Sequence, residues 1–216
     1  MKIETVTIEN TIGKTFDVNL IKQEEPVKKV AVFFPGVGYT TKFPLFYYST
    51  ALFREKGYDV LHVNYDFRSK EYETLTNEEY ANCIKEDTKK AVDVSLSNHS
   101  YEEFVVLGKS IGTMAMSYEM DTREWFSDAK AIWLTPLIHN NFVFEKMSTC
   151  TQNSLSVIGS ADFAYKEDRW NEIGQLSNYQ TLLLEGADHS LEIKSDLEQS
   201  LDLMKQTIQA IEKFIG

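Results

Sequence analysis

One serine of the chain lies in a sequence context that can produce a nucleophile. Ser110 is the centre of a Gly-x-Ser-x-Gly segment, Gly108 to Gly112, which follows an apolar run and precedes a segment of helical character. A turn from strand to helix within so few residues crowds the positions two before and two after the serine, so glycine is needed at both. The free N–H groups of the helix would point toward Ser110. The pattern therefore predicts an activated serine.

A competing interpretation comes from Gly108-Lys109-Ser110, which matches the end of a phosphate-binding Gly-x-x-x-x-Gly-Lys-Ser loop. The first glycine of that loop would fall at position 103, which is Glu103. The residues between Glu103 and Gly108 are Phe, Val, Val and Leu, which form a strand and not a loop. The nucleotide-binding interpretation is therefore rejected.

A serine nucleophile needs a base within hydrogen-bond reach and a carboxylate that orients the base. His189 follows the last apolar run and precedes the last helical segment. Asp162 is the first carboxylate after the preceding apolar run, which makes it the predicted orienting acid, with Asp168 as the alternative. Asp188 is the immediate neighbour of His189, and an adjacent side chain is poorly placed to bond the imidazole. The predicted chain order is Ser110, Asp162, His189.

Two backbone N–H groups are needed to stabilise the oxyanion that forms during acyl transfer. Ile111, directly after the serine, supplies one candidate donor. The other is expected in the loop after the first buried strand, Phe34-Pro35-Gly36-Val37-Gly38-Tyr39, where two glycines allow close approach of a substrate. We predict the N–H of Val37 as the second donor; the alternative is an ordinary Pro-Gly turn.

The elements that must position these residues can be inferred from hydrophobic patterning. Residues 2–9 and 16–22 alternate polar and apolar side chains, which predicts two antiparallel strands with one solvated face. Nearly continuous apolar runs follow, as expected of buried parallel strands. These runs are Val30–Phe34, Tyr58–Val63, Phe104–Leu107, Ala131–Leu134, Leu155–Ile158 and Leu182–Leu184. The expected fold class is α/β, with a mostly parallel sheet, an antiparallel start and helices on both faces.

Helices are predicted between most of these strands. They cover residues 44–56, 77–95 with a Thr76-x-x-Glu79 capping box, and 112–120. A last helix is predicted to open with a Ser195-x-x-Glu198 box. Its apolar positions 197, 201, 204, 208, 211 and 215 predict one face packed on the sheet.

The chain resembles the α/β-hydrolase family over nearly its whole length, from Val30 onward. The resemblance is carried by the Gly108–Gly112 turn, by Asp162 and His189 after the last two strands, and by the Pro35–Gly38 turn. It implies Ser110 as nucleophile, His189 as general base and Asp162 as its orienting acid. The chain has Pro35-Gly36 where many members have His-Gly.

The segment between Pro136 and Leu155 is too short for a cap domain, so we expect residues 1–216 to form one domain with an open pocket. Candidate pocket residues are Gly36, Tyr39, His139 and Phe142, with Phe43, Phe46 and Phe144 as further possible walls. The predicted activity is hydrolysis of a small carboxylic ester or thioester. Two alternatives remain open: an amide or peptide hydrolase with the same residues, and a non-catalytic protein that binds a small molecule or partner.

Composition narrows the function classes. The formal net charge of −11 and the pI near 4.9 argue against nucleic acid as a partner. The histidines are scattered, with His62 in a strand and His99 after a helix, and the sequence has no Cys-x-x-Cys, so no metal or other cofactor is expected. The N-terminal residues lack an apolar signal segment, no run is long enough to span a membrane, and the two cysteines favour a reduced setting, so a cytoplasmic location is expected.

Overall fold

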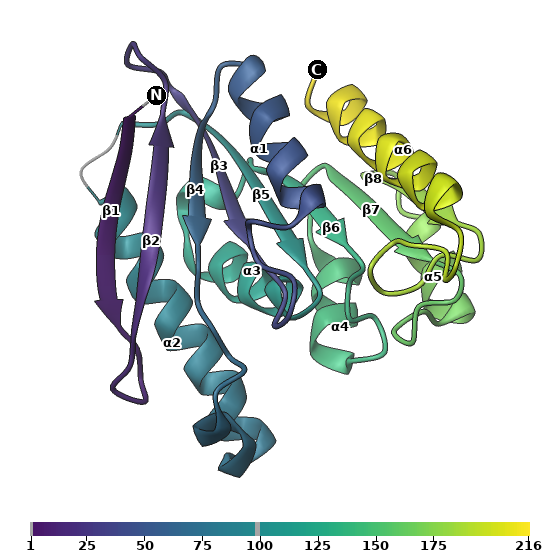
Figure 1. The fold of residues 1–216 in the computed structure, drawn as a ribbon, viewed down its shortest axis with the longest axis horizontal. Coiled ribbons are helices and arrows are strands. Elements are labelled where there is room, and N and C mark those ends of the chain that lie inside the picture. Colours follow the sequence, from purple (N-terminus) through teal and green to yellow (C-terminus); the bar gives the residue numbers. More distant parts are fainter. Residues whose placement is uncertain (1, 98–99) are drawn as a thin grey trace.

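Within residues 2–97 and 100–216, which the computed structural model describes, the chain forms an eight-stranded sheet with helices on both faces (Figure 1). The strands are β1 (Lys2–Glu9), β2 (Thr15–Lys22), β3 (Lys29–Phe34), β4 (Asp59–Val63), β5 (Glu103–Lys109), β6 (Lys130–Leu134), β7 (Ser154–Gly159) and β8 (Tyr179–Leu184). The helices are α1 (Pro44–Glu55), α2 (Asn77–Leu96), α3 (Ile111–Thr122), α4 (Asn141–Thr149), α5 (Glu167–Gly174) and α6 (Leu197–Ile215). His99 lies outside the described residues.

The sheet is mixed, as predicted. Its strand order is β1-β2-β4-β3-β5-β6-β7-β8, in which β1 pairs with β2, and β2 with β4, in antiparallel fashion. The pairs from β4 through β8 are parallel. The alternating pattern of the first two strands gives them one polar face, where Thr5 Oγ1 donates to Asn19 Oδ1 across the pair at 2.9 Å. The α/β fold class with an antiparallel start is thus confirmed.

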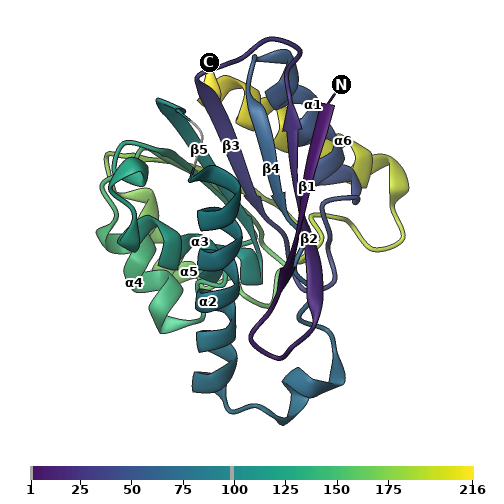
Figure 2. The same ribbon diagram turned by 90° about the vertical axis from the view of Figure 1, so that its left-hand side faces the viewer.

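The helices form two layers, one on each face of the sheet (Figure 2). Helices α2, α3, α4 and α5 bury apolar side chains in one core cluster, and α1 and α6 do so in the other. The central strands contribute to both clusters, which explains their continuous apolar sequence: all five residues of β4 and all six of β7 are buried. Two helices of the first layer, α4 and α5, were not predicted.

The run Leu182–Leu184 was expected to be buried on both faces, but it belongs to β8, the last strand of the sheet. Its burial alternates weakly, and the Leu183 side chain is 36% exposed. An edge strand has a neighbour on one side only, so a short apolar run does not guarantee burial on both faces.

The start of α6 also differs from the prediction. Asp196, not Ser195, is the N-cap residue, and its carboxylate accepts from Gln199 N at 2.9 Å. Ser195 lies outside the helix with φ 67°. Leu197 and Leu201 are 75% and 61% exposed. The buried side of the helix consists of Leu203, Thr207, Ile211, Phe214 and Ile215. The predicted apolar stripe is therefore correct only toward the C-terminal half of the helix.

The other helix ends agree closely with prediction. The capping box of α2 is present, since Thr76 accepts from Glu79 N while the Glu79 carboxylate accepts from Thr76 N. Helix α1 ends before Gly57, which has φ 81° and follows the C-cap residue. Of the helices in the described part of the chain, none combines the length and apolar composition that crossing a membrane requires.

Candidate active site

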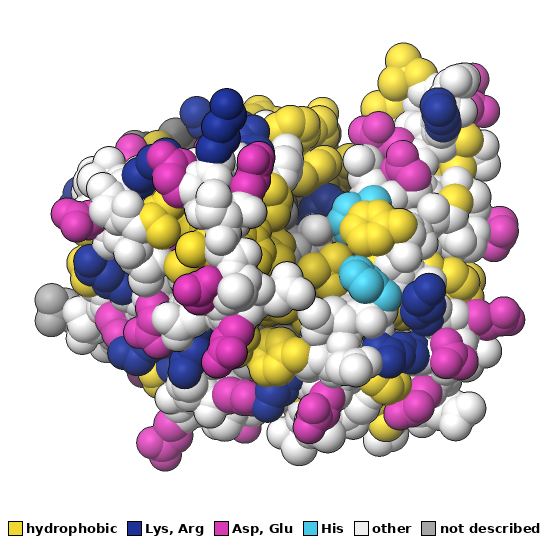
Figure 3. All heavy atoms as spheres, turned by 90° about the horizontal axis from the view of Figure 1, so that it is seen from below, with side chains coloured by type: hydrophobic (Ala, Val, Ile, Leu, Met, Phe, Trp, Pro, Cys, Tyr) yellow, Lys and Arg dark blue, Asp and Glu magenta, His cyan; other side chains and the backbone are white. Residues whose placement is uncertain are grey.

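The loops that carry the predicted site residues meet at the carboxyl edge of the parallel strands. Strand β3 lies between β4 and β5, so the connections leaving β3 and β5 run to opposite sides of the sheet. In such sheets a crevice forms where the strand order reverses. Phe34 at the end of β3 pairs with Gly108 of β5. Seen from this edge, the surface has a hollow bordered by histidine and hydrophobic side chains (Figure 3).

Ser110 occupies a sharp turn between β5 and α3. Its φ of 55° and ψ of −122° are unusual for a residue other than glycine, and such strain is common at functional sites. A Cβ atom added to Gly108 would lie 2.6 Å from the carbonyl oxygen of Gly112. One added to Gly112 would lie 1.9 Å from the carbonyl oxygen of Phe34. Both glycines of the motif are therefore required by close backbone packing, as predicted.

The structure brings the three predicted side chains together. Ser110 Oγ lies 2.8 Å from Nε2 of His189, and Nδ1 of the same ring lies 2.8 Å from both carboxylate oxygens of Asp162. A proton on Nδ1 that is donated to Asp162 leaves Nε2 free to accept from the serine hydroxyl. The arrangement has the connectivity of a nucleophile, a base and an orienting acid.

Asp162, rather than Asp168 or Asp188, is the carboxylate that contacts His189. Asp162 is 5% exposed, and its Oδ1 also accepts from Ala164 N at 2.8 Å. Asp188 instead accepts from the backbone N–H of Ser190 within its own loop. Asp168 lies exposed in the first turn of α5.

The loops that hold Asp162 and His189 are packed directly against each other. Ala161 N donates to the carbonyl of Ala187 at 3.0 Å. A Cβ on Gly159 would lie 2.0 Å from that same carbonyl oxygen, so only glycine permits the approach. Gly159 is not among the residues predicted from the sequence, although its position at the end of a buried strand is a usable signal.

The loop after β3 approaches Ser110 from the other side. A Cβ on Gly36 would lie 3.3 Å from Cβ of Ser110. The loop is held by a bond from Gly36 N to the carbonyl of Tyr39 and by the buried hydroxyl of Tyr65, which donates to the carbonyl of Pro35 at 2.7 Å. Val37 lines the cavity beside Ser110, and Ile111 follows the serine at the start of α3. Their roles as oxyanion donors stay predictions.

A cavity of about 500 Å³ opens over Ser110. It is lined by Gly36, Val37, Gly38, Tyr39, Phe43, Lys109, Ser110, Phe163, His189, Ser190 and Glu192. The rings of Tyr39 and Phe43 lie 4.8 Å apart on one side. On the other side the Phe163 ring, 64% exposed, lies 4.4 Å from the His189 ring. Phe163 is not among the pocket residues predicted from the sequence, although its position directly after Asp162 is a signal that could have identified it.

Other predicted pocket residues lie elsewhere. Of the described residues that line this cavity, none is His139, Phe142 or Phe46. Phe142 belongs to α4, where its ring stacks on Tyr118 of α3 at 4.6 Å. Phe46 is fully buried in the core. His139 is exposed, 5.6 Å from the Phe163 ring, and therefore lies one ring away from His189. An unrecognised helix at 141–149 explains the wrong prediction for Phe142.

Lys109 is the most unusual lining residue, because its side chain is 1% exposed. Its Nζ donates to the carbonyl of His189 at 2.7 Å and to Thr135 Oγ1 at 2.9 Å. Burial lowers the pKa of Lys109 to about 8, and the nearby carboxylates of Asp162, Asp188 and Glu192 act in the opposite direction.

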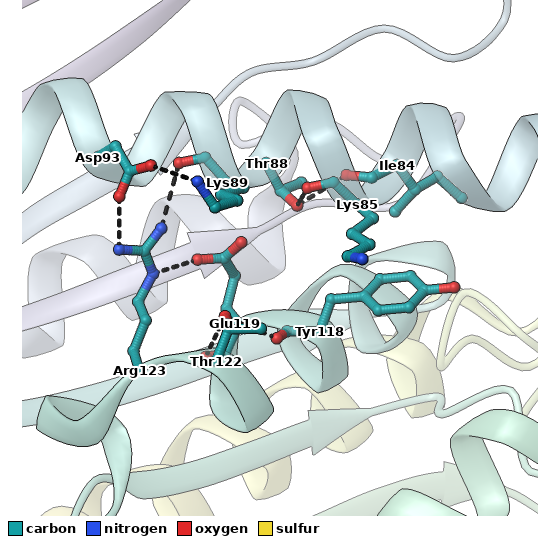
Figure 4. A network of polar contacts seen from close by, with 9 residues as sticks. All are labelled: Ile84, Lys85, Thr88, Lys89, Asp93, Tyr118, Glu119, Thr122 and Arg123. Carbon is teal, nitrogen blue, oxygen red and sulfur yellow. Dashed lines mark hydrogen bonds and ion pairs between the residues drawn. The ribbon is translucent and has the colours of Figure 1, made fainter.

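Helix α3, whose first residues form the serine turn, is tied to α2 by a partly buried ion network (Figure 4). Arg123, just after α3, donates to Glu119 at 2.5 Å and to Asp93 of α2 at 2.7 Å. Another guanidinium nitrogen donates to the carbonyl of Lys89 at 3.2 Å. Burial raises the pKa of Glu119, while the charge of Arg123 acts to lower it. Removal of Arg123 would leave the buried Glu119 carboxylate without its ion-pair partner.

Comparisons with known proteins agree with the observed fold. No family model matches the chain, and no curated protein matches it by sequence. Among solved structures it is similar to an esterase from Pyrococcus furiosus, with TM-score 0.70, 14% identity, and coverage of 100% of this chain and 92% of that one. An α/β serine hydrolase homologue from Coxiella burnetii aligns with TM-score 0.67 and 14% identity over 95% of this chain and 96% of that one.

A third similar structure is a member of the α/β serine hydrolases without a lid from Xanthomonas campestris. It aligns with TM-score 0.63 and 12% identity over 99% of this chain and 95% of that one. At these identities the likeness concerns the fold. The same fold is indicated by the mixed sheet, the serine turn after β5 and the loops after β7 and β8. The chain has the α/β-hydrolase fold.

Proposed function

We propose that the protein is a serine hydrolase that cleaves a small carboxylic ester or thioester through an acyl-enzyme on Ser110. The observation that carries the proposal is the unbroken chain of contacts from Ser110 Oγ through His189 to Asp162, each 2.8 Å long. It begins at a strained serine at the start of α3. A binding protein has no need of this arrangement.

In the acylation step, Ser110 Oγ attacks the carbonyl carbon while its proton passes to Nε2 of His189. Asp162, bonded to Nδ1, stabilises the imidazolium that forms. The N–H groups of Ile111 and Val37 stabilise the negative oxygen of the tetrahedral intermediate. The ester C–O or thioester C–S bond then breaks, and the leaving group takes the proton from His189.

In the second step, water gives a proton to His189 and attacks the acyl carbon. The bond between that carbon and Ser110 Oγ breaks, and the proton returns to the serine. The products are a carboxylic acid and the free enzyme. Every proton transfer uses the same imidazole, so loss of His189 should stop both steps.

The size of the substrate follows from the cavity. A volume of about 500 Å³ with Tyr39, Phe43 and Phe163 as apolar walls suits a short or medium acyl group. The connection between β6 and β7 contains only α4, so the described part of the chain has no covering domain over Ser110 at that position. This supports small esters or thioesters over long-chain lipids. The lidless hydrolase from Xanthomonas campestris has the same fold.

The test is labelling with a fluorophosphonate probe, followed by a screen of p-nitrophenyl esters of increasing acyl length. Wild type should be labelled on Ser110, and Ser110→Ala and His189→Ala should not. Thr113→Ser, which retains the hydroxyl that donates to the Ser110 carbonyl at 2.6 Å, serves as a mutated control from the same helix. A folded wild type that resists labelling would contradict the proposal and favour a non-catalytic binding protein.

A further inference from the structure

Lys109 forms contacts with three separate loops around the candidate site. It ends β5, directly before Ser110, on the face of the strand where Val105 and Leu107 pack in the α1 and α6 core. From there Nζ donates to Thr135 after β6 and to the carbonyl of His189 after β8. It also lies 4.8 Å from the centre of the Tyr39 ring in the loop after β3. A residue with an ionisable side chain thus occupies a buried position on a strand face that is otherwise apolar.

The contact with His189 concerns the backbone of the residue whose imidazole bonds Ser110. His189 lies in a loop between β8 and α6, so no helix or strand fixes its carbonyl. Leu191 in this loop has φ 64°, a left-handed conformation that is unusual for a residue other than glycine and needs support from its surroundings. The bond of 2.7 Å from Lys109 anchors this loop to the same strand that presents the serine.

The ammonium form of Lys109 matches these surroundings in number of donors. An ammonium has three N–H groups and no acceptor, and its three partners here are two oxygens and the face of an aromatic ring. A neutral amine has two N–H groups and a lone pair, and the lone pair would face one of these electron-rich partners. Bonds from an ionised donor are also roughly twice as strong as neutral ones.

We propose that Lys109 is a positioning residue. As an ammonium ion it holds the backbone of His189 so that the imidazole stays within hydrogen-bond distance of Ser110. This inference rests on the proposed function. In this role Lys109 does not contact substrate atoms but acts through His189. Its contact with Tyr39 joins the loop after β3 to the same lysine.

The proposal predicts a loss of activity at alkaline pH. Lys109 is charged below its pKa, which is about 8, and becomes neutral as the pH rises through that value. The groups that face it are Tyr39 after β3, Asp162 after β7, and Asp188, His189 and Glu192 after β8. Burial raises the pKa of Tyr39 to about 12, so a fall in activity near pH 8 does not come from the phenol.

The experiment compares Lys109→Met, Lys109→Arg and Thr135→Val with wild type. The readouts are the second-order rate constant of fluorophosphonate labelling and kcat/KM on a p-nitrophenyl ester, both measured between pH 6 and 10, together with the melting temperature. Lys130→Met is the matched control, because Lys130 Nζ also donates to a backbone carbonyl, that of Ile215, at 2.9 Å but at the opposite end of β6.

Lys109→Met should lower kcat/KM by about 10²-fold at pH 7, since a displaced base costs that much, and should lack the alkaline fall of wild type. Lys109→Arg should restore much of the rate and move the fall to higher pH, because arginine stays charged. Thr135→Val removes an acceptor from the ammonium, so the fall should move to lower pH. Lys130→Met should match wild type in both readouts.

The outcomes separate the two proposals. Labelled wild type with the same rate and pH profile in all Lys109 and Thr135 variants would overturn the positioning role and leave the hydrolase proposal intact. A lower melting temperature with an unchanged pH profile would also overturn it, as Lys109 would then be structural only. If Lys109→Met does not fold, the opposite shifts expected of Lys109→Arg and Thr135→Val decide the question. Wild type that is not labelled overturns the proposed function itself.

Discussion

Gly112, in the first turn of α3, lies directly against the carbonyl of Phe34 at the end of β3. A Cβ atom at position 112 would be 1.9 Å from that oxygen, and 2.8 Å from the carbonyl oxygen of Pro35. The same glycine therefore permits both the serine turn and the approach of the loop that carries Gly36 and Val37. One backbone contact sets the spacing between the nucleophile and the expected second oxyanion donor.

Gly112→Ala should accordingly damage both stability and activity. The atoms that a methyl group would meet are backbone atoms, which cannot move aside as a flexible side chain can. We expect a loss of unfolding free energy of about 3 kcal/mol, the upper part of the range for overpacked sites. Urea unfolding measures it. Gly174→Ala is the control, because its Cβ would meet only Thr181 Oγ1 at 3.8 Å, and it should stay close to wild type.

Asp162→Asn should lower the rate of Ser110 labelling by a factor on the order of 10³ to 10⁴, the loss known when the acid of such a triad is replaced by its amide. The amide can donate to Nδ1 of His189, which would shift the ring proton to Nε2 and leave no acceptor for the serine hydroxyl. The measurement is the labelling rate at pH 7, with folding checked by circular dichroism.

Asp168→Asn is the matched control for this substitution. Asp168 is exposed in the first turn of α5 and was the alternative acid in the sequence. Its variant should label at the wild-type rate. If the two variants lose activity equally, the assignment of Asp162 is wrong.

Phe163→Ala should affect substrate binding far more than stability. The ring is 64% exposed, so its removal should change the unfolding free energy by no more than about 0.5 kcal/mol. It lines the cavity beside His189, and we expect KM to rise with little change in kcat, most strongly for longer acyl groups. Tyr47 on α1 is also 64% exposed. Tyr47→Ala is the control, and an equal rise of KM in both variants would rule out a specific role for Phe163.

The parts of the site that could be predicted from sequence are those set by short spacings. The turn at Ser110 needs two glycines at fixed positions, and an acid and a histidine after the last strands fall at the same sheet edge in any parallel sheet. In the structure these three side chains, Ser110, His189 and Asp162, contact one another in that order. The expected oxyanion donors, Ile111 directly after the serine and Val37 in the loop after β3, stay predictions.

The parts that sequence did not predict depend on contacts between distant segments. Lys109 contacts residues 26 and 80 positions away, and nothing near it in the sequence indicates either partner. Phe142 was expected in the pocket, but α4 is only nine residues long and turns that ring toward Tyr118. A usable signal existed at Asn140, whose side chain accepts from the N–H groups of Phe142 and Val143 as a helix cap.

His62 should make the folded protein less stable in acid. The ring is buried in β4, stacks on Phe33 at 5.6 Å and bonds Thr50 Oγ1 at 2.8 Å. Burial lowers its pKa from 6.5 to about 4. As the pH falls, His62 therefore takes up its proton in the unfolded chain before it does so in the folded protein. This stabilises the unfolded chain relative to the folded one, and the effect reaches its full size once the pH falls below about 4. The full effect is a loss of about 3 kcal/mol of unfolding free energy between pH 6.5 and 4, with none above 6.5.

His62→Phe isolates this contribution from that of the carboxylates. Phenylalanine keeps a ring against Phe33, and Thr50 retains a partner because its hydroxyl also donates to the carbonyl of Phe46 at 2.7 Å. Urea unfolding at several pH values should give wild type a steeper fall below pH 6.5 than the variant, and the two curves should run parallel above it. Parallel curves throughout the acid range would mean that His62 takes up its proton in the folded state as readily as in the unfolded chain.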